Sequence, residues 1–257
     1  MLPQSPDDRL RRWTSARLRA PQLELTVDRL GVFERLVDSG LQHGPATPIE
    51  YDCPYPKHEF LTYLVERRGF LLHGSRDRDI RVFEPREAHD LFEFSSQRAL
   101  YAASDGIWPM VFAIRVPSTR QVAFINGCSR AQLADGTLSP AHYHFAVAAE
   151  GLREQSWTDG MLYVLPRTTF VPHPTQEEAG LTVTLEEWAT SEPIVPIMKV
   201  EVRPEDFPFV DEFWGYDPRV VQDRYRFFDP DGQRAWTEFD HADRELFPIA
   251  APSFRRG

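Results

Sequence analysis

Apolar residues in the first part of the chain recur at every third or fourth position. This spacing extends over residues 5–18, 27–40 and 56–69. Prolines stand near the starts of the first and third segments, and glycines follow the second and third. Such a pattern predicts three amphipathic helices. The segment 44–56 between the last two is rich in proline and is expected to be a loop.

The pattern changes after residue 69. Phe70, Leu71 and Leu72 form a short apolar run typical of a buried strand, and the run ends in His73-Gly74-Ser75. The segment 76–98 is polar and irregular, and a second short strand is expected over 99–102. Ser104 is interpreted as the cap of a helix whose inward face includes residues between Ile107 and Ile114.

The later part of the chain is rich in strand patterns, which are separated by turn signals such as Asn126-Gly127 and Asp135-Gly136. Strands are expected at 121–126, 142–148, 160–165, 181–189 and 196–203. The predicted fold is α+β, with helices first and a mostly antiparallel or mixed sheet after them. Residues 1–68 are expected to form a helical segment, 69–215 the main domain, and 216–257 a tail packed on it.

Composition narrows the classes of function. The chain has 257 residues and a net charge of −10, which disfavours general binding to a phosphate backbone. Its two cysteines, Cys53 and Cys128, are too far apart for a zinc motif or a disulfide framework, as in a cytoplasmic protein. No apolar run of about 18 residues predicts a membrane span, and no apolar signal segment is recognised, so we expect a cytoplasmic protein without a membrane partner.

Three parts of the chain suit the cleavage of the nicotinamide–ribose bond of NAD. The flat pyridinium needs an aromatic face, its carboxamide can bind a bare glycine backbone, and the oxocarbenium-like transition state needs a carboxylate. His73-Gly74 follows one strand, Tyr101 lies on the next, and Glu186-Glu187-Trp188 lies on a late strand. Each feature alone is more often structural, so the interpretation depends on their order along the chain.

These residues resemble three motifs of the ADP-ribosyltransferase superfamily, in its His-Tyr-Glu branch, which includes poly-ADP-ribose polymerases and diphtheria-toxin-like enzymes. Leu72-His73-Gly74-Ser75 resembles the first motif, residues 99–103 the second, and 186–188 the third. The run 79–114 is also similar to a group of bacterial proteins of uncertain activity. The resemblance covers about residues 68–205 and implies a split, mostly antiparallel sheet core.

The resemblance also implies roles for individual residues. His73 would hold a ribose hydroxyl, the Gly74 backbone the carboxamide, and Ser75 the carboxamide or the loop. Tyr101 would stack on nicotinamide. Glu187 would hold the ribose 2′-hydroxyl and stabilise the oxocarbenium ion, with Glu186 in reserve because strand alternation points only one of the pair into a cleft.

Other positions complete the expected NAD site. Ala102 and Ser104 are small residues after the stacking tyrosine, and Phe112 stands where the branch often has a second stacking tyrosine. The implied enzyme is a glycosyltransferase or NAD glycohydrolase with NAD as its substrate. Its acceptor is open, although the acidic charge favours a protein or a small molecule over nucleic acid. A degenerate module that binds NAD or a protein without turnover is the alternative.

A metal site is a second alternative. His142 and His144 would point to one face of a strand, with Glu150 after them and His173 later. This loosely resembles the cupin pattern for a divalent metal. However, Glu150 is expected in a helix or turn, His173 lies between two prolines, and the glycines of that pattern are mostly missing.

Overall fold

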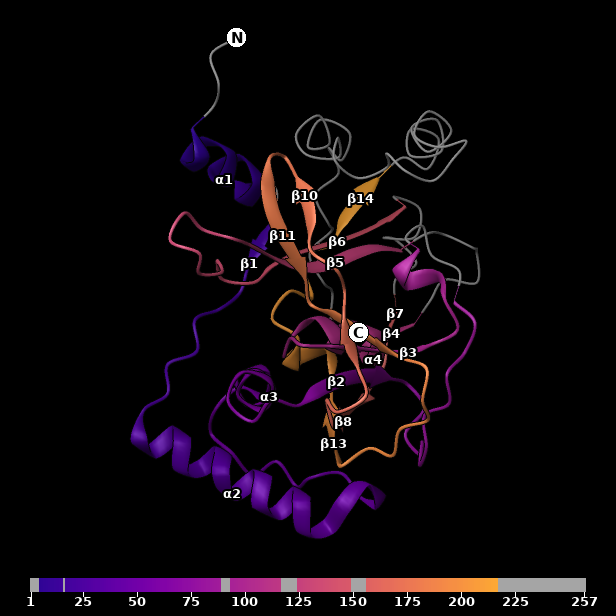
Figure 1. The fold of residues 1–257 in the computed structure, drawn as a ribbon. Coiled ribbons are helices and arrows are strands. Elements are labelled where there is room, and N and C mark those ends of the chain that lie inside the picture. Colours follow the sequence, from indigo (N-terminus) through magenta and orange to yellow (C-terminus); the bar gives the residue numbers. More distant parts are fainter. Residues whose placement is uncertain (1–4, 16, 89–92, 117–123, 149–155, 217–257) are drawn as a thin grey trace.

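The computed structural model describes residues 5–15, 17–88, 93–116, 124–148 and 156–216. These residues form an α+β fold whose strand pairs are antiparallel, apart from one parallel pair between β14 and β6 (Figure 1). The α-helices are α1 (Pro6–Ser15), α2 (Val27–His43), α3 (Lys57–Glu66) and α4 (Trp108–Ile114), and the short 3-10 helices are η1 (Gly44–Ala46), η2 (Phe94–Ser96) and η3 (Pro204–Asp206).

One six-stranded sheet, here called sheet B, contains residues of all three motifs. Its strand order is β13-β8-β2-β3-β12-β9. The strands are β2 (Leu71–Ser75), β3 (Leu100–Ala103), β8 (Gly160–Leu165), β9 (Val171–Pro172), β12 (Glu187–Thr190) and β13 (Met198–Val202). Strands that are far apart in sequence are therefore neighbours, and β3 lies between β2 and β12.

A second six-stranded sheet, here called sheet A, has the order β1-β6-β5-β11-β10, with β14 also paired to β6. Its strands are β1 (Leu18–Arg19), β5 (Phe124–Ala131), β6 (His142–Ala148), β10 (Gln176–Glu178), β11 (Leu181–Leu185) and β14 (Trp214–Tyr216). A separate pair joins β4 (Arg115–Val116) to β7 (Ser156–Trp157). The described residues thus form two sheets, which agrees with the mixed fold expected from the sequence.

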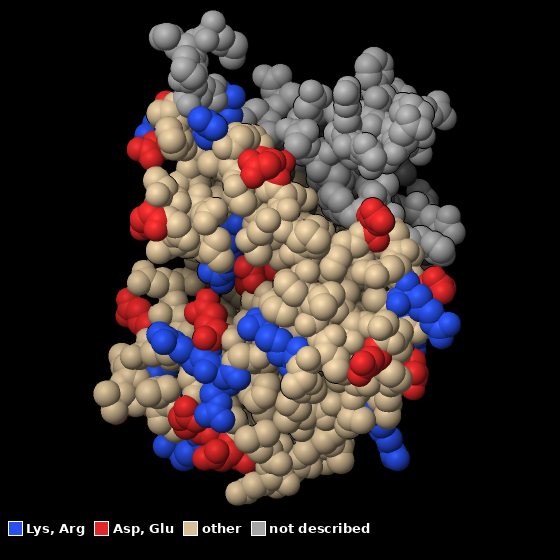
Figure 2. Space-filling view, in the orientation of Figure 1, with Lys and Arg blue, Asp and Glu red and all other residues tan. Residues whose placement is uncertain are grey.

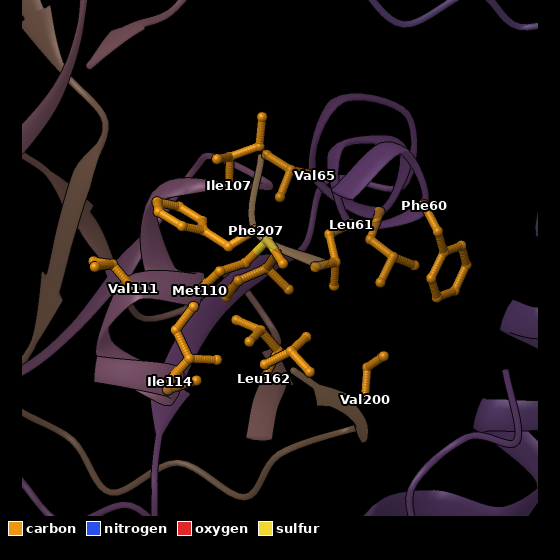
Figure 3. Close-up of a cluster of buried hydrophobic side chains, with 14 of the residues drawn as sticks. Phe60, Leu61, Val65, Ile107, Met110, Val111, Ile114, Leu162, Val200 and Phe207 are labelled. Atoms are coloured by element: carbon orange, nitrogen blue, oxygen red, sulfur yellow. The ribbon is translucent and has the colours of Figure 1, made fainter. Parts of the chain in front are cut away.

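The main apolar core contains side chains from the helices, from sheet B and from β5 and β6 of sheet A. Side chains from α3, α4, β8 and β13 converge there, and Figure 3 shows them together. Met110 and Val111 of α4 are fully buried, as are Leu61 of α3 and Leu162 of β8. Burying such side chains contributes about 1.5–3 kcal/mol each, so this contact holds α4 firmly against the sheet.

Two glycines allow α4 to approach sheet B backbone to backbone. A Cβ at Gly74 would lie 1.9 Å from the carbonyl oxygen of Pro109, and a Cβ at Gly160 would lie 2.0 Å from that of Ala113. Distances this short are impossible between real atoms, so only glycine fits at either position. Gly74 therefore has a packing role in addition to any role in binding.

The N-terminal segment is joined to both sheets. Trp13 of α1 is fully buried beside Ala131 and Val183 of sheet A, and β1 pairs with β6. Farther along, α2 and α3 supply Phe33 and Phe60 to the main core. The expected tail, from residue 217 onward, lies outside the described residues.

Four local expectations were wrong. Helix α2 continues through Gly40 to His43, because its C-terminal cap is Gly44. The described part of β5 runs through Asn126-Gly127, which is therefore not a turn. Ile107 stands at the N-cap of α4, and Asp105 rather than Ser104 supplies the side chain that caps the helix, since its Oδ1 accepts from the amides of residues 107 and 108.

The fourth wrong expectation concerns the predicted strand 181–189. This segment divides at Glu186 into β11 of sheet A and β12 of sheet B. The apolar pattern could not reveal the division, because both halves have strand character and only long-range pairing separates them.

Candidate functional site

The first motif lies where β2 and β3 part. Strand β2 pairs with β8 from Leu71 to Ser75, whereas its pairing with β3 is confined to Leu72 opposite Ala103. Beyond that pair, the backbone edge of His73 to Ser75 is not part of the β3 ladder. The imidazole Nδ1 of His73 lies 2.7 Å from the carbonyl oxygen of Tyr101 and so links the two strands beyond their ladder pair.

The environment of His73 favours its neutral form. Burial lowers the pKa of the imidazole, the bond to the Tyr101 carbonyl raises it, and the nearby charge of Arg86 lowers it again, with a net lowering. Because a carbonyl only accepts, Nδ1 carries the proton in that neutral form, and Nε2 presents a lone pair. His73 is thus suited to accept a hydrogen bond from a hydroxyl group.

Tyr101 and Glu187 share one face of sheet B. Ala189 lies opposite Tyr101, and Glu187 lies opposite Ala103, in the antiparallel pair of β3 and β12. Residues directly opposite each other, and residues two apart in a strand, point to the same side. An aromatic ring and a carboxylate are therefore neighbours on this face, which is the combination that the second and third motifs predicted.

His73 lies toward the other side of the sheet. Leu72 is opposite Ala103 and shares the face of Tyr101, so the alternation of the strand turns the neighbouring His73 away. Its ring centroid lies 4.7 Å from that of Phe83. Phe83 belongs to a second apolar cluster, which consists of Leu71, Phe83, Leu100, Ala102, Met161, Tyr163, Leu165, Phe170 and Ile194. The structure thus places Tyr101 and Glu187 on one face of sheet B, and it joins His73 to Tyr101 through the backbone carbonyl of Tyr101.

The short helix η2 contacts both residues of this face. The hydroxyl of Ser95 donates to Oε2 of Glu187 at 2.6 Å. The phenol of Tyr101 donates to the carbonyl of Phe94 at 3.0 Å and accepts from the amide of Gln97 at 3.2 Å. The carboxylate of Glu187 therefore already accepts from a hydroxyl group, which is the chemistry that it would need at a ribose.

His173 follows β9, which pairs directly with β12, and it lies beside Glu187. Its amide donates to the carbonyl of Glu187 at 2.8 Å, and its ring packs 4.7 Å from that of Phe94. Burial lowers the pKa of this imidazole, although the bond of Nδ1 to the Pro174 carbonyl raises it. The sequence suggested His173 only as a metal ligand, and no local signal linked it to Glu187.

Glu186 points away from this face and into the interior between the sheets. Its carboxylate accepts from the hydroxyl of Ser104 and lies 3.0 Å from Nε of Arg130. Burial raises its pKa, while the charge of Arg130 and the bond from Ser104 lower it. This arrangement leaves Glu187 as the carboxylate on the face of Tyr101, and it gives Ser104 a partner inside the protein.

The remaining expected NAD-binding residues have the following surroundings. The hydroxyl Oγ of Ser75 accepts a hydrogen bond from the amide of Asp77 at 3.1 Å and so supports the loop after β2. Ala102 is buried in the second apolar cluster, on the face opposite Tyr101. Phe112 is 44% exposed, and its ring packs edge-on against Trp108 and Phe124. Phe112 is thus placed by aromatic contacts with its own helix and with β5.

The alternative metal ligands do not form a cluster among the residues that the structure describes. Nδ1 of His142 bonds to the carbonyl of Pro140, and its ring packs on Trp13. The ring of His144 packs closely on the backbone of Gly127: a Cβ at residue 127 would lie only 2.6 Å from Cε1 of His144. Glu150 lies outside the described residues.

Comparison with known proteins adds no relative to this geometry: no family model, curated protein or solved structure matches the chain. Within the described part of the chain, no helix has the length and apolar character needed to cross a bilayer.

Proposed function

We propose that the protein binds NAD against the face of Tyr101 and Glu187 and cleaves its nicotinamide–ribose bond. The observation that carries this proposal is the neighbouring placement of an aromatic ring and a carboxylate that already accepts a hydroxyl donor. The ring would stack on the nicotinamide, and the carboxylate would hold the ribose 2′-hydroxyl and stabilise positive charge at C1′.

The short pairing between β2 and β3 supports a place for the rest of the nicotinamide riboside. The β2 backbone edge that the β3 ladder does not use would bind the carboxamide at Gly74. His73, which is joined to Tyr101 through the backbone carbonyl, would meet a ribose hydroxyl at this edge with its Nε2 lone pair. In the reaction, the C1′–N bond breaks, and its electron pair leaves with neutral nicotinamide. Water or another acceptor then bonds to C1′ and loses a proton.

The surface charge supports a protein or a small molecule as the acceptor. The whole chain carries a net charge of −10. On the face that Figure 2 displays, basic and acidic side chains are interspersed. Such a surface gives little general attraction to a nucleic-acid backbone, which needs clustered positive charge.

Nicotinamide release from NAD tests the proposal. We expect Glu187→Gln to lower the rate by about two orders of magnitude, because it removes the charge that stabilises the transition state. Glu192→Gln is the matched control, since Glu192 is exposed just after the same strand. His73→Ala should also lower the rate, whereas Tyr101→Phe should retain affinity for NAD because it keeps the ring.

The outcomes separate three cases. Release that is insensitive to both Glu187→Gln and His73→Ala would show that the assigned site is wrong. Saturable NAD binding by calorimetry without release would contradict cleavage and favour a module that only binds NAD. Absence of both binding and release would overturn the proposal altogether.

A further inference from the structure

Glu186 connects the two sheets immediately before Glu187. Strand β11 of sheet A ends at Leu185, and β12 of sheet B begins at Glu187. The amide of Glu186 donates to the carbonyl of Cys128 in sheet A at 3.0 Å, and its carbonyl accepts from the amide of Ser104, beyond β3, at 2.9 Å. A single residue thus bonds to both sheets through its backbone.

The side chain of Glu186 strengthens the same connection. It accepts from the hydroxyl of Ser104 on the sheet B side, and it pairs at 3.0 Å with Nε of Arg130, which lies on β5 of sheet A. Arg130 is itself held by Glu66 of α3 at 3.1 Å. Glu186 is 7% exposed, and a buried carboxylate is stable only with such partners, so its direction is well determined.

We propose that Arg130 and Ser104, acting through Glu186, are positioning residues that hold Glu187 in its reactive direction. The inference depends on the proposed NAD cleavage. Glu187 is the first residue of its strand and directly follows Glu186, and successive side chains along an extended chain point to opposite faces. Fixing Glu186 between the sheets therefore fixes Glu187 on the face of Tyr101.

A second buried ion pair provides a matched control. Arg17 pairs with Glu178 of β10, and these side chains are 12% and 10% exposed, compared with 20% and 9% for Arg130 and Glu186. Glu178 belongs to sheet A and does not adjoin a residue of the candidate site. A purely structural role for Glu186 predicts similar consequences from Glu186→Gln and Glu178→Gln.

The experiment compares kcat and KM for nicotinamide release in these two variants, at a temperature where both are fully folded. We expect Glu186→Gln to lower kcat about tenfold to a hundredfold, the effect of misplacing a catalytic group, with KM for NAD within about twofold. Glu178→Gln should change neither value by more than about twofold. Arg130→Lys, which keeps the charge, should recover much of the kcat lost in Arg130→Met.

Equal kcat values in Glu186→Gln and Glu178→Gln would overturn the positioning role while leaving NAD cleavage intact. If the wild-type protein releases no nicotinamide, the proposed cleavage is wrong. Amide hydrogen exchange then tests separately whether Glu186 holds the two sheets together. Amide exchange at Ser104 and residue 186 that is at least about tenfold faster in Glu186→Gln than in Glu178→Gln would support this role of the Glu186 side chain. Unchanged exchange would overturn it.

Discussion

The hydroxyl of Ser95 donates a 2.6 Å hydrogen bond to the carboxylate of Glu187, a residue 92 positions later in the chain. Ser95 is buried in η2, and the backbone around it also bonds to the phenol of Tyr101. A ribose hydroxyl offers the same O–H donor as serine. The chain therefore places its own hydroxyl where the proposed substrate would place one.

This relationship predicts that Ser95 competes with NAD for Glu187. Ser95→Ala is expected to lower KM for NAD about fivefold, since one hydrogen bond contributes about 1 kcal/mol, and to leave kcat nearly unchanged. Steady-state nicotinamide release would measure both values, with Glu192→Gln, an exposed position just after β12, as the control. A KM that rises in Ser95→Ala would mean that Ser95 assists substrate binding instead.

Replacing two glycines by alanine is expected to change the free energy of unfolding in opposite directions, because Gly74 lies in the contact between β2 and α4 and Gly31 lies inside α2. Gly74→Ala should destabilise the fold by about 3 kcal/mol or more, because the added methyl would collide with the carbonyl of Pro109. Gly31→Ala should stabilise it by about 0.5–1 kcal/mol, since Gly31 lies inside α2 and its nearest obstacle is the flexible end of Arg35 at 3.6 Å. Urea denaturation would give both values, and a neutral Gly74→Ala would contradict the close packing.

Replacing Asp105 is expected to lower the stability of the fold, because its carboxylate bonds to both α4 and sheet A. Its Oδ1 caps α4, and its Oδ2 accepts from the phenol of Tyr143 on β6 at 2.8 Å. We expect Asp105→Ala to cost about 2–4 kcal/mol, because the cap is lost and a buried phenol loses its partner. Tyr143→Phe should cost less, and denaturation of the double variant would measure the coupling. Strict additivity would show that the two groups do not interact energetically.

His144 predicts a loss of stability in acid. Burial, followed by the charge of Arg17, lowers its pKa from 6.5 to about 3 in the folded protein. The unfolded chain therefore binds this proton at higher pH than the folded chain, and stability falls as pH drops from about 6.5 towards 3. The contribution of this group is at most about 1.4 kcal/mol per pH unit.

Urea unfolding between pH 7 and pH 4 would measure this effect. His144→Phe removes the titrating group and should make the free energy of unfolding less dependent on pH than in the wild type. The lowered pKa values of His58, His73, His142 and His173 act in the same direction in both proteins, so the comparison isolates His144. Identical slopes would contradict the burial of its neutral form.

Local patterns were enough to predict the α+β class, the four α-helices of the described residues and the strands that flank His73 and Tyr101. These features follow from short-range spacing of apolar residues and from glycine and proline signals, which a sequence displays directly. The sequence also predicted Glu187 as the carboxylate of the site, with its neighbour Glu186 as the alternative, but it could not determine which of the two faces Tyr101.

Long-range contacts decided the rest. The division of 181–189 between two sheets, the ion pair of Glu186 with Arg130, and the bond from Ser95 to Glu187 each join residues far apart in the chain. The sequence by itself determined which chemical groups are present and where strands and helices tend to form. Only the tertiary structure decided which way the groups point, because side-chain direction in a strand depends on the partner strand and on the face that the rest of the protein covers.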